Sequence, residues 1–384
     1  MPENKFYEGE NKMKKIIALL LALVMVFALC ACGQTAAPAN DAQTEAPKAD
    51  DAAKADDAAK ADDTAADDGA DDFYLEIKFS NVFNPKEWNY KASEKLAEMI
   101  TEQTDGHITV TYYGTNELDC YADSVTQAVN GANWMGLEEP SLFADYVGDA
   151  AMVIAPMLYA TNEEYNYVMD SEFVANLIEE LKESNIHILD THYSFGFRSV
   201  CSNLDVYTPE DLHGHQFRAT SSALFAKTLE CLGATPVVMG FTDCLAAIQQ
   251  GVVEGFEGSV STLAGAGEPY ELVKKVASTN HLIATRWLFM PEDVWQTIPE
   301  KYQKIIEDCA YECGMWEQKS CQDDEATQIE MLKENGVTWN DVDLAAFQEA
   351  CKPVIDWIVD EYGSTYEAYD ELTRLVAEYR ANNG

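Results

Sequence analysis

Apolar residues alternate with polar ones in two short runs near the beginning of the folded region, each is followed by a run with helical spacing, and a third short strand is expected after the second helix. Leu75, Ile77 and Phe79 begin this pattern. The spacing predicts strands at 75–79, 108–112 and 132–137, with helices at 92–100 and 121–129 between them. Strands that alternate with helices in this way are typical of an α/β fold built on a parallel sheet.

The most regular pattern runs from Gly214 to Ser259, where three expected strands alternate with two expected helices. A crossing strand at 186–193 precedes it, and Phe195 to Arg198 would lead into a second domain. The expected elements of the unit are a strand at 215–218, a helix that begins after Ser221 or Ser222 and stops at Gly233, a buried strand at 236–239, a helix capped by Thr242 and ended by Gly251, and a strand that opens at Val252 and runs to Gly258. Ligands of such sheets bind beyond the carboxyl ends of the strands, where Arg218 and the turn at 255–259 would meet.

One long helix is predicted in the last third of the chain. An apolar stripe at helical spacing begins at Tyr302, passes through Ile306, Cys309 and Cys313, and is expected to continue to about Asn335. A helix of that length spans about 50 Å, which is long enough to lie across two domains.

The composition allows a large core and limits the possible partners. Hydrophobic residues make up 47% of the 384 residues, enough for two domains. The formal net charge of −42 argues against binding of nucleic acid or of an anionic membrane surface. Only five arginines occur, and three of them, Arg198, Arg218 and Arg286, lie within the central 90 residues. Arginine is the natural bidentate partner of a carboxylate, so this placement suggests an anion site, with ordinary structural ion pairs as the alternative.

The N-terminus has the pattern of an export signal. Lys14 and Lys15 precede an apolar run at 16–29 that is too short to favour a membrane-spanning helix. The run ends in Leu29-Cys30-Ala31-Cys32, which matches a lipobox with Cys32 as the lipidated residue. We therefore interpret residues 1–32 as a lipoprotein signal peptide that starts at Met13, with simple secretion or retention as the alternatives.

Residues 33–72 are expected to form a disordered acidic linker. Twelve acidic residues face three lysines there, and the segment contains no aromatic or β-branched aliphatic residue. Such a composition cannot bury enough surface to offset the entropy of ordering. A flexible coil of this length spans about 35 Å, which suits a domain held away from a membrane surface.

Eight further cysteines follow this linker. Their even number in an exported protein would allow disulfides, but no Cys-x-x-Cys motif occurs among them, and Cys231 and Cys309 fall on apolar helix faces. We expect mostly free, buried thiols. Cys309 and Cys313 lie one helical turn apart, but no histidine is near them in the sequence, so a metal site is not expected.

An ordered series of motifs resembles the solute-binding subunit of tripartite ATP-independent periplasmic (TRAP) transporters. The motifs are "DLHGHQFRAT" at 211–220, "LGATPVVMGFTDCLAAIQQGVVEGFEGS" at 232–259, "STNHL" at 278–282 and "VWQTIPEKYQKII" at 294–306. The resemblance extends from about Leu75 to the C-terminus and is most specific at 211–306.

This resemblance implies a two-lobed fold like that of periplasmic binding proteins, with two α/β domains around a ligand cleft and a long helix that spans both. The domains would comprise 73–195 with about 284–323, and 196–283 with about 324–384. The protein would be an extracytoplasmic monomer, anchored by its lipidated cysteine. It would close over an organic acid and deliver it to the small and large membrane subunits of a TRAP permease.

The resemblance also carries over individual residues. Arg218 matches the principal carboxylate-binding arginine of the family, and Arg198 matches a second arginine. The remaining candidates for ligand contact are Glu138, Asn81, Phe241, Trp134, Gly258 and Ser259. The chain departs from the family where Gly258 replaces a common asparagine and Leu245 a common tyrosine. These departures leave the class of organic acids but put the identity of the acid in doubt.

Two other classes of function remain as alternatives. The closed protein could dock on a membrane sensor and not on a permease, and the sequence does not separate the two. An enzyme that acts on a small carboxylate in the same cleft is less favoured, because none of the hydrolase, zinc-protease or phosphate-loop motifs occurs. No catalytic residue, metal or organic cofactor is expected.

Overall fold

The computed structural model describes residues 72–383 of the chain. All of these residues belong to one compact unit. The predicted signal peptide, the lipidated Cys32 and the acidic linker up to residue 71 lie outside the described residues. No helix in the described part of the chain combines the length and the apolar character that crossing a membrane requires.

The described strands form one sheet. They are β1 (Leu75–Ser80), β2 (Ile108–Tyr113), β3 (Trp134–Glu138), β4 (Ile186–Ser202), β5 (Gln216–Ala219), β6 (Thr235–Val238), β7 (Gly255–Gly258), β8 (Lys275–Pro291) and β9 (Thr338–Asn340). Their order is β2-β1-β3-β8-β4-β7-β5-β6, and β9 pairs with β8.

Helices of very different length cover this sheet. They are α2 (Trp88–Gln103), α3 (Ala122–Val129), α4 (Asp149–Met152), α5 (Asn162–Met169), α6 (Glu172–Lys182), α7 (Ala223–Cys231), α8 (Phe241–Gln249), α9 (Val260–Ala264), α10 (Glu292–Trp295), α11 (Glu300–Glu334), α12 (Leu344–Tyr362) and α13 (Tyr366–Asn383), with short 3-10 turns η2 (Pro140–Phe143), η3 (Pro209–Leu212) and η4 (Pro269–Glu271).

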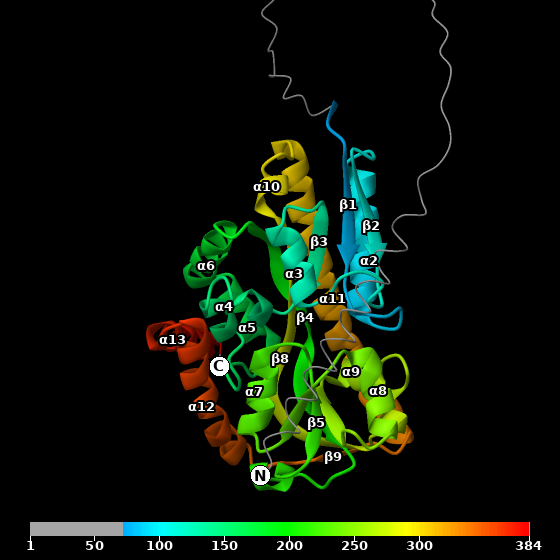
Figure 1. Ribbon diagram of the computed structural model, residues 1–384, viewed down its shortest axis with the longest axis vertical. Helices are drawn as coiled ribbons and strands as arrows, with labels where there is room; N and C mark the ends of the chain where they lie inside the picture. The colour runs from blue at the N-terminus through cyan, green and yellow to red at the C-terminus, as the bar shows by residue number, and fades with distance from the viewer. Residues whose placement is uncertain (1–71, 384) are drawn as a thin grey trace, which may run out of the picture. The chain divides into compact units, whose positions relative to one another are not determined.

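Two long antiparallel strands join the two halves of the sheet. In one half β2, β1 and β3 run parallel, and in the other β6, β5 and β7 run parallel. Between them lie β4 and β8, each 17 residues long. Figure 1 shows these two strands passing from the end that carries β1 and β2 to the end that carries β5 and β9. The predicted α/β class is confirmed.

The long helix of the last third is confirmed as α11, which spans 35 residues and is capped at Asn335. It packs against β4, against α2 in one half and against α9 in the other. The close approach to β4 needs Gly314, because a Cβ atom there would lie 2.4 Å from an oxygen of Asp190 and 3.1 Å from the ring of Tyr193. α11 is therefore the shared support of both halves.

The predicted unit at 214–259 is confirmed in its order of elements and wrong in several details. Helix α7 has Ser222 as its N-cap, and Gly233 follows its last turn with a φ of 99°. The strand β6 is an edge strand and not a buried one, since Val238 is 55% exposed. An edge position explains why Pro236, which has no N–H to donate, is tolerated.

Two further boundaries in this unit differ from the prediction. The N-cap of α8 is Gly240 and not Thr242, which lies inside the first turn. Strand β7 begins at Gly255, three residues after the predicted start, and Val252 is exposed. The crossing strand is also longer than the predicted 186–193, because β4 continues through Arg198 to Ser202. Arg198 is thus part of the central sheet and not of a connection after it.

The cysteines of the described residues carry free thiols, as the sequence predicts. Seven of the eight are buried, and Cys231 is half-buried. Burial raises the pKa of several of these thiols, for example that of Cys313 to about 12. They are small apolar side chains of the core in their neutral form.

Candidate functional site

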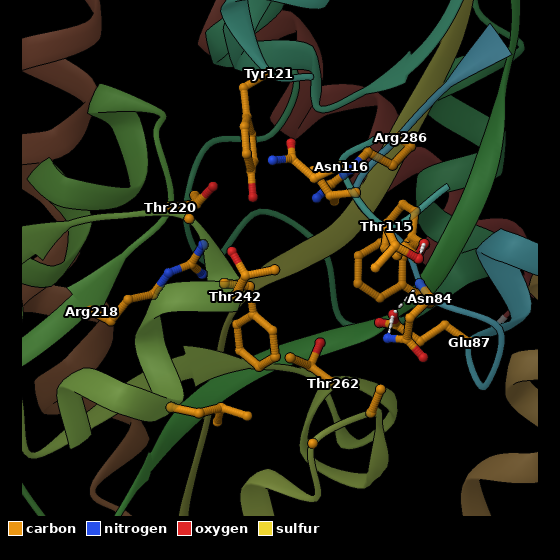
Figure 2. Close-up of a pocket in the computed structure, with 18 of the residues that line it drawn as sticks. Asn84, Glu87, Thr115, Asn116, Tyr121, Arg218, Thr220, Thr242, Thr262 and Arg286 are labelled. Atoms are coloured by element: carbon orange, nitrogen blue, oxygen red, sulfur yellow. Dashed lines mark hydrogen bonds between the residues drawn. The ribbon is translucent and has the colours of Figure 1, made fainter. Parts of the chain in front are cut away.

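The two halves of the sheet face each other across a cavity of about 270 Å³. Figure 2 shows side chains from both halves directed into this space. We refer to this cavity as the cleft. Its lining residues are Val82, Phe83, Asn84, Glu87, Thr115, Asn116, Tyr121, Phe195, Arg198, Arg218, Thr220, Gly240, Phe241, Thr242, Leu245, Thr262, Ala266, Gly267 and Arg286.

Several polar groups of the cleft lie in the segments that follow the carboxyl ends of parallel strands. Asn84 belongs to the loop after β1, Thr115 and Asn116 follow β2, Thr220 follows β5, and Gly240 follows β6. In open α/β sheets this edge is where ligands bind, because the connecting loops and helix starts leave their polar groups there. The fold therefore brings two sets of loops, one from each half, against one cavity.

Arg218 lines the cleft, and neither terminal nitrogen of its guanidinium donates to a described residue. Only 3% of its surface is exposed, and its Nε donates to the backbone oxygen of Met239 at 2.9 Å. Its guanidinium lies 5.5 Å from the ring centre of Phe241. No acidic side chain among the described residues pairs with it, and its two terminal nitrogens donate to none of them. A buried guanidinium in this state is ready to bind an anion.

Arg198 also lines the cleft, but its charge is already compensated. Its Nε and one terminal nitrogen donate to the two carboxylate oxygens of Glu257, the latter at 2.7 Å, and a third bond reaches the Glu257 backbone oxygen at 3.1 Å. Both side chains are at least 95% buried. The family resemblance matches both Arg198 and Arg218 to arginines of the family, but in this structure only Arg198 has an acidic partner.

Arg286 is the third arginine of the cleft. It lies between the rings of Phe83 and Phe195, at 5.4 and 5.3 Å from their centres. One terminal nitrogen donates to the Thr285 backbone oxygen at 2.7 Å and lies 3.7 Å from a carboxylate oxygen of Glu139. Its buried Nε has no partner in the described part of the chain. The three central arginines of the sequence thus converge on one cavity.

Carboxyl groups at and behind the cleft have raised pKa values. Burial raises the pKa of Glu138 to about 8 and that of Glu87 to about 7, in each case against the attraction of Arg286. Glu138 is therefore largely neutral at pH 7, and it accepts a hydrogen bond of 2.6 Å from the backbone N–H of Tyr121. This bond holds Tyr121 at a φ of 59°, with its ring in the cleft. The negative charge that would oppose an anion is thereby reduced.

The eight candidate contact residues are divided among three places. Arg218, Arg198 and Phe241 line the cleft. Asn81 and Glu138 lie directly behind its wall and hold it in place. The side-chain oxygen of Asn81 accepts bonds from the Phe83 backbone N–H at 3.1 Å and from the Tyr112 hydroxyl at 2.8 Å.

Trp134, Gly258 and Ser259 lie away from the cleft. Trp134 is buried, donates from Nε1 to the Ser124 hydroxyl at 3.0 Å and lines a separate groove beside β1 and β2. Gly258 and Ser259 line a second cavity of about 220 Å³ next to β4 and β8. A Cβ atom at Gly258 would lie 3.1 Å from both Phe256 and Thr262. The glycine therefore relieves crowding at the junction of β7 and α9.

Several cleft residues were not singled out by the sequence analysis. The rule of strand carboxyl ends indicated Asn81, whereas the cleft begins with the next residues, Val82 to Asn84. The same rule would also have found Thr115 and Thr220. Arg286 was indicated in the sequence only as one of the three central arginines that suggest an anion site. Nothing local in the sequence indicates Tyr121, because its position depends on the buried Glu138.

Comparisons with a family model and with individual proteins indicate the same family for this chain. The model of a family described as bacterial extracellular solute-binding protein, family 7, matches residues 79–361. A curated relative, the C4-dicarboxylate-binding periplasmic protein of Rhodobacter capsulatus, is 24% identical, and the match covers 76% of this chain and 88% of the relative.

Two solved structures are more similar in sequence. A TRAP periplasmic solute-binding protein of Desulfovibrio salexigens, in complex with diglycerolphosphate, is 34% identical, with a TM-score of 0.78 and coverage of 81% of this chain and 99% of that one. A TRAP periplasmic solute-binding protein of Fusobacterium nucleatum with bound sn-glycerol-3-phosphate is 30% identical, with a TM-score of 0.78 and coverage of 80% and 99%.

Proposed function

This chain belongs to the bacterial extracellular solute-binding proteins of family 7, the family of TRAP solute-binding subunits, and from this membership we propose that it captures a small organic anion and delivers it to a TRAP permease. The resemblance found in the sequence and the two-lobed fold are confirmed by the comparisons. The family is one of binding proteins, which favours capture over catalysis.

One observation carries the proposal of an anionic ligand. Arg218 is buried at the wall of the cleft with two terminal nitrogens that no described side chain uses. A buried charge without a partner is costly, and protein structures normally avoid it. A ligand that carries a carboxylate or a similar anionic group would compensate this charge through two parallel hydrogen bonds.

The similar proteins support an anionic ligand for this chain, although the anionic head groups of their own ligands differ. The ligands of these proteins include a C4-dicarboxylate, sn-glycerol 3-phosphate and diglycerolphosphate. The organic acid that the sequence analysis expects belongs to the proposed class of small organic anions. A small acid with polar substituents also matches the opposite wall, where Asn84, Asn116 and Thr115 offer amide and hydroxyl groups.

We further propose that capture proceeds by closure of two lobes. The expected domains, 73–195 with 284–323 and 196–283 with 324–384, each contribute one wall of the cleft, and β4 and β8 connect them. Contacts that the ligand makes with both walls exist only in the closed form and shift the population toward it. The closed form would be the one that the membrane subunits recognise.

Anchoring through Cys32 is the third part of the proposal. Because lipidation of Cys32 would attach the chain to the membrane, Cys32→Ala should move the protein from the membrane fraction to the soluble extracytoplasmic fraction, as measured by immunoblotting. Cys30→Ala is the matched control and should leave the distribution unchanged. A Cys32→Ala protein that stays with the membrane would contradict this anchor.

The experiment that tests the function is thermal unfolding of residues 73–384 against a panel of small anions. The panel contains mono- and dicarboxylates, sugar acids, keto acids and phosphate esters, with neutral sugars and peptides as controls. A ligand at 100 times its dissociation constant adds about 2.7 kcal/mol to the free energy of unfolding, so a hit should raise the midpoint by several degrees. A response to neutral sugars or peptides alone would rule out an anion-binding subunit.

A further inference from the structure

Helix α8 begins at the wall of the cleft without a side-chain cap. Its N-cap is Gly240, and no side chain accepts a hydrogen bond from its first turn. The backbone N–H groups of Phe241 and Thr242 donate to no other described residue, although Gly240, Phe241 and Thr242 all line the cleft. The first N–H groups of a helix need partners from outside it, and together they present a partial positive charge.

Arg218 is fixed beside this helix start. The backbone oxygen of Met239, which precedes the N-cap, accepts the bond from Arg218 Nε and leaves both terminal nitrogens free. Figure 2 shows Arg218 grouped with Thr220 and Thr242 on one wall, with the hydroxyl of Tyr121 directed toward them from above. This wall therefore carries free donors of three kinds, from a buried guanidinium, a helix N-terminus and side-chain hydroxyls.

The number and directions of these donors distinguish between anions. A carboxylate is planar, has two oxygens and carries one charge, so Arg218 alone can satisfy most of it. A phosphate monoester carries three acceptor oxygens in a tetrahedral arrangement and a charge of about −1.5 to −2 at neutral pH. Such a group can use the guanidinium, the backbone N–H groups and the hydroxyls together, and helix N-termini commonly bind phosphate.

Each of the other two arginines of the cleft has an acidic neighbour within the protein. Arg198 is compensated by Glu257, and Arg286 lies 3.7 Å from Glu139. Among the three cleft arginines, Arg218 is the one without an ion pair to any described residue, and it lies beside the start of α8, whose first turn carries the exposed Asp243.

We propose that Arg218, the N-terminus of α8 and the hydroxyls of Thr220 and Thr242 form a phosphoryl subsite, so that the ligand is a small hydroxylated phosphate ester. This inference rests on the proposed function and narrows its ligand class. The alcohol part of the ester would face Asn84, Glu87 and Asn116 on the opposite wall, where amide and carboxyl groups can bind hydroxyls.

Gly240 offers a test that does not depend on removing a charge. Its φ of −60° and ψ of 155° suit any residue, and a Cβ atom there would meet only the Thr242 hydroxyl, at an ordinary 3.7 Å. In Gly240→Ser the new hydroxyl can accept from the first turn of α8 and occupy the N–H groups that the phosphoryl group would need. Gly240→Ala adds the same carbon without an acceptor and is the matched control.

The measurement is calorimetric titration of residues 73–384 and of both variants with sn-glycerol 3-phosphate and with D-glycerate. The parent protein should bind the phosphate ester at least tenfold more tightly than glycerate. Gly240→Ser should weaken binding of the phosphate ester at least tenfold more than Gly240→Ala does, whereas the two variants should differ from each other by less than threefold in their affinity for glycerate. Because a serine cap does not destabilise a helix, the unfolding midpoint of the free variant should not fall.

The outcomes separate this inference from the proposed function. Tighter binding of glycerate, or equal losses in the serine and alanine variants, would overturn the phosphoryl subsite while the anion-binding function stands. Binding of neither probe, together with silence of the whole anion panel, would overturn both.

Discussion

Arg218→Ala should weaken binding of the anion by roughly 150- to 5,000-fold without lowering the stability of the free protein. Removing one partner of a buried, hydrogen-bonded charge pair costs about 3–5 kcal/mol, and here the ligand would be the other partner. In the free protein Arg218 has no acidic partner among the described residues, so its removal relieves a buried charge. Titration calorimetry measures the affinity, and thermal unfolding measures the stability.

Two further variants make this prediction specific. Arg218→Lys keeps the charge but loses the planar fork, so it should restore only a small part of the affinity. Arg374→Ala is the surface control, because Arg374 is 55% exposed and pairs with Glu371 and Glu378 on its own helix. A ligand that binds Arg218→Ala as tightly as the parent would exclude Arg218 from the site.

Glu257→Ala should lower the stability of the free protein, which Arg218→Ala should not do. We expect a loss of about 3–5 kcal/mol in the free energy of unfolding. The carboxylate of Glu257 is 1% exposed and compensates Arg198, and its removal leaves the buried guanidinium without a counter-ion. The pair also fastens β7 to β4, because Glu257 lies opposite Val200 in the sheet. Urea unfolding followed by circular dichroism measures the effect.

Matched controls test whether the loss arises from this pair. Glu254→Ala, three residues earlier, removes a partner of His215 that is 42% exposed, and it should cost less than about 1 kcal/mol. Arg198→Ala/Glu257→Ala should be more stable than the sum of the single losses predicts, since neither charge is left alone. Additive losses would show that the two side chains do not stabilise each other.

The two predictions contrast arginines that look alike in the sequence. Arg198 and Arg218 are both scarce, central and matched to family positions, and both line the cleft. One is part of the protein's own ion pair, and the other is held by a single backbone oxygen. The first therefore contributes mainly to stability, and the second is available to a ligand.

The sequence by itself determined the order of elements, the α/β class and the family. These depend on local patterns: strand and helix periods differ, and the apolar stripe of α11 persists over many turns. Local signals also located the end of α7 at Gly233. The concentration of arginines in the centre of an acidic chain was enough to suggest an anion site.

Only the tertiary structure decided which groups meet in the cleft and in what electrostatic state. Glu257 reaches Arg198 across 59 positions of sequence because β7 lies beside β4, and Glu138 positions Tyr121 from behind the wall. The edge position of β6 and the glycine cap of α8 likewise follow from the place of these elements in the sheet. The physical reason is that burial, pKa and hydrogen-bond partners depend on neighbours distant in the chain, which local periodicity does not encode.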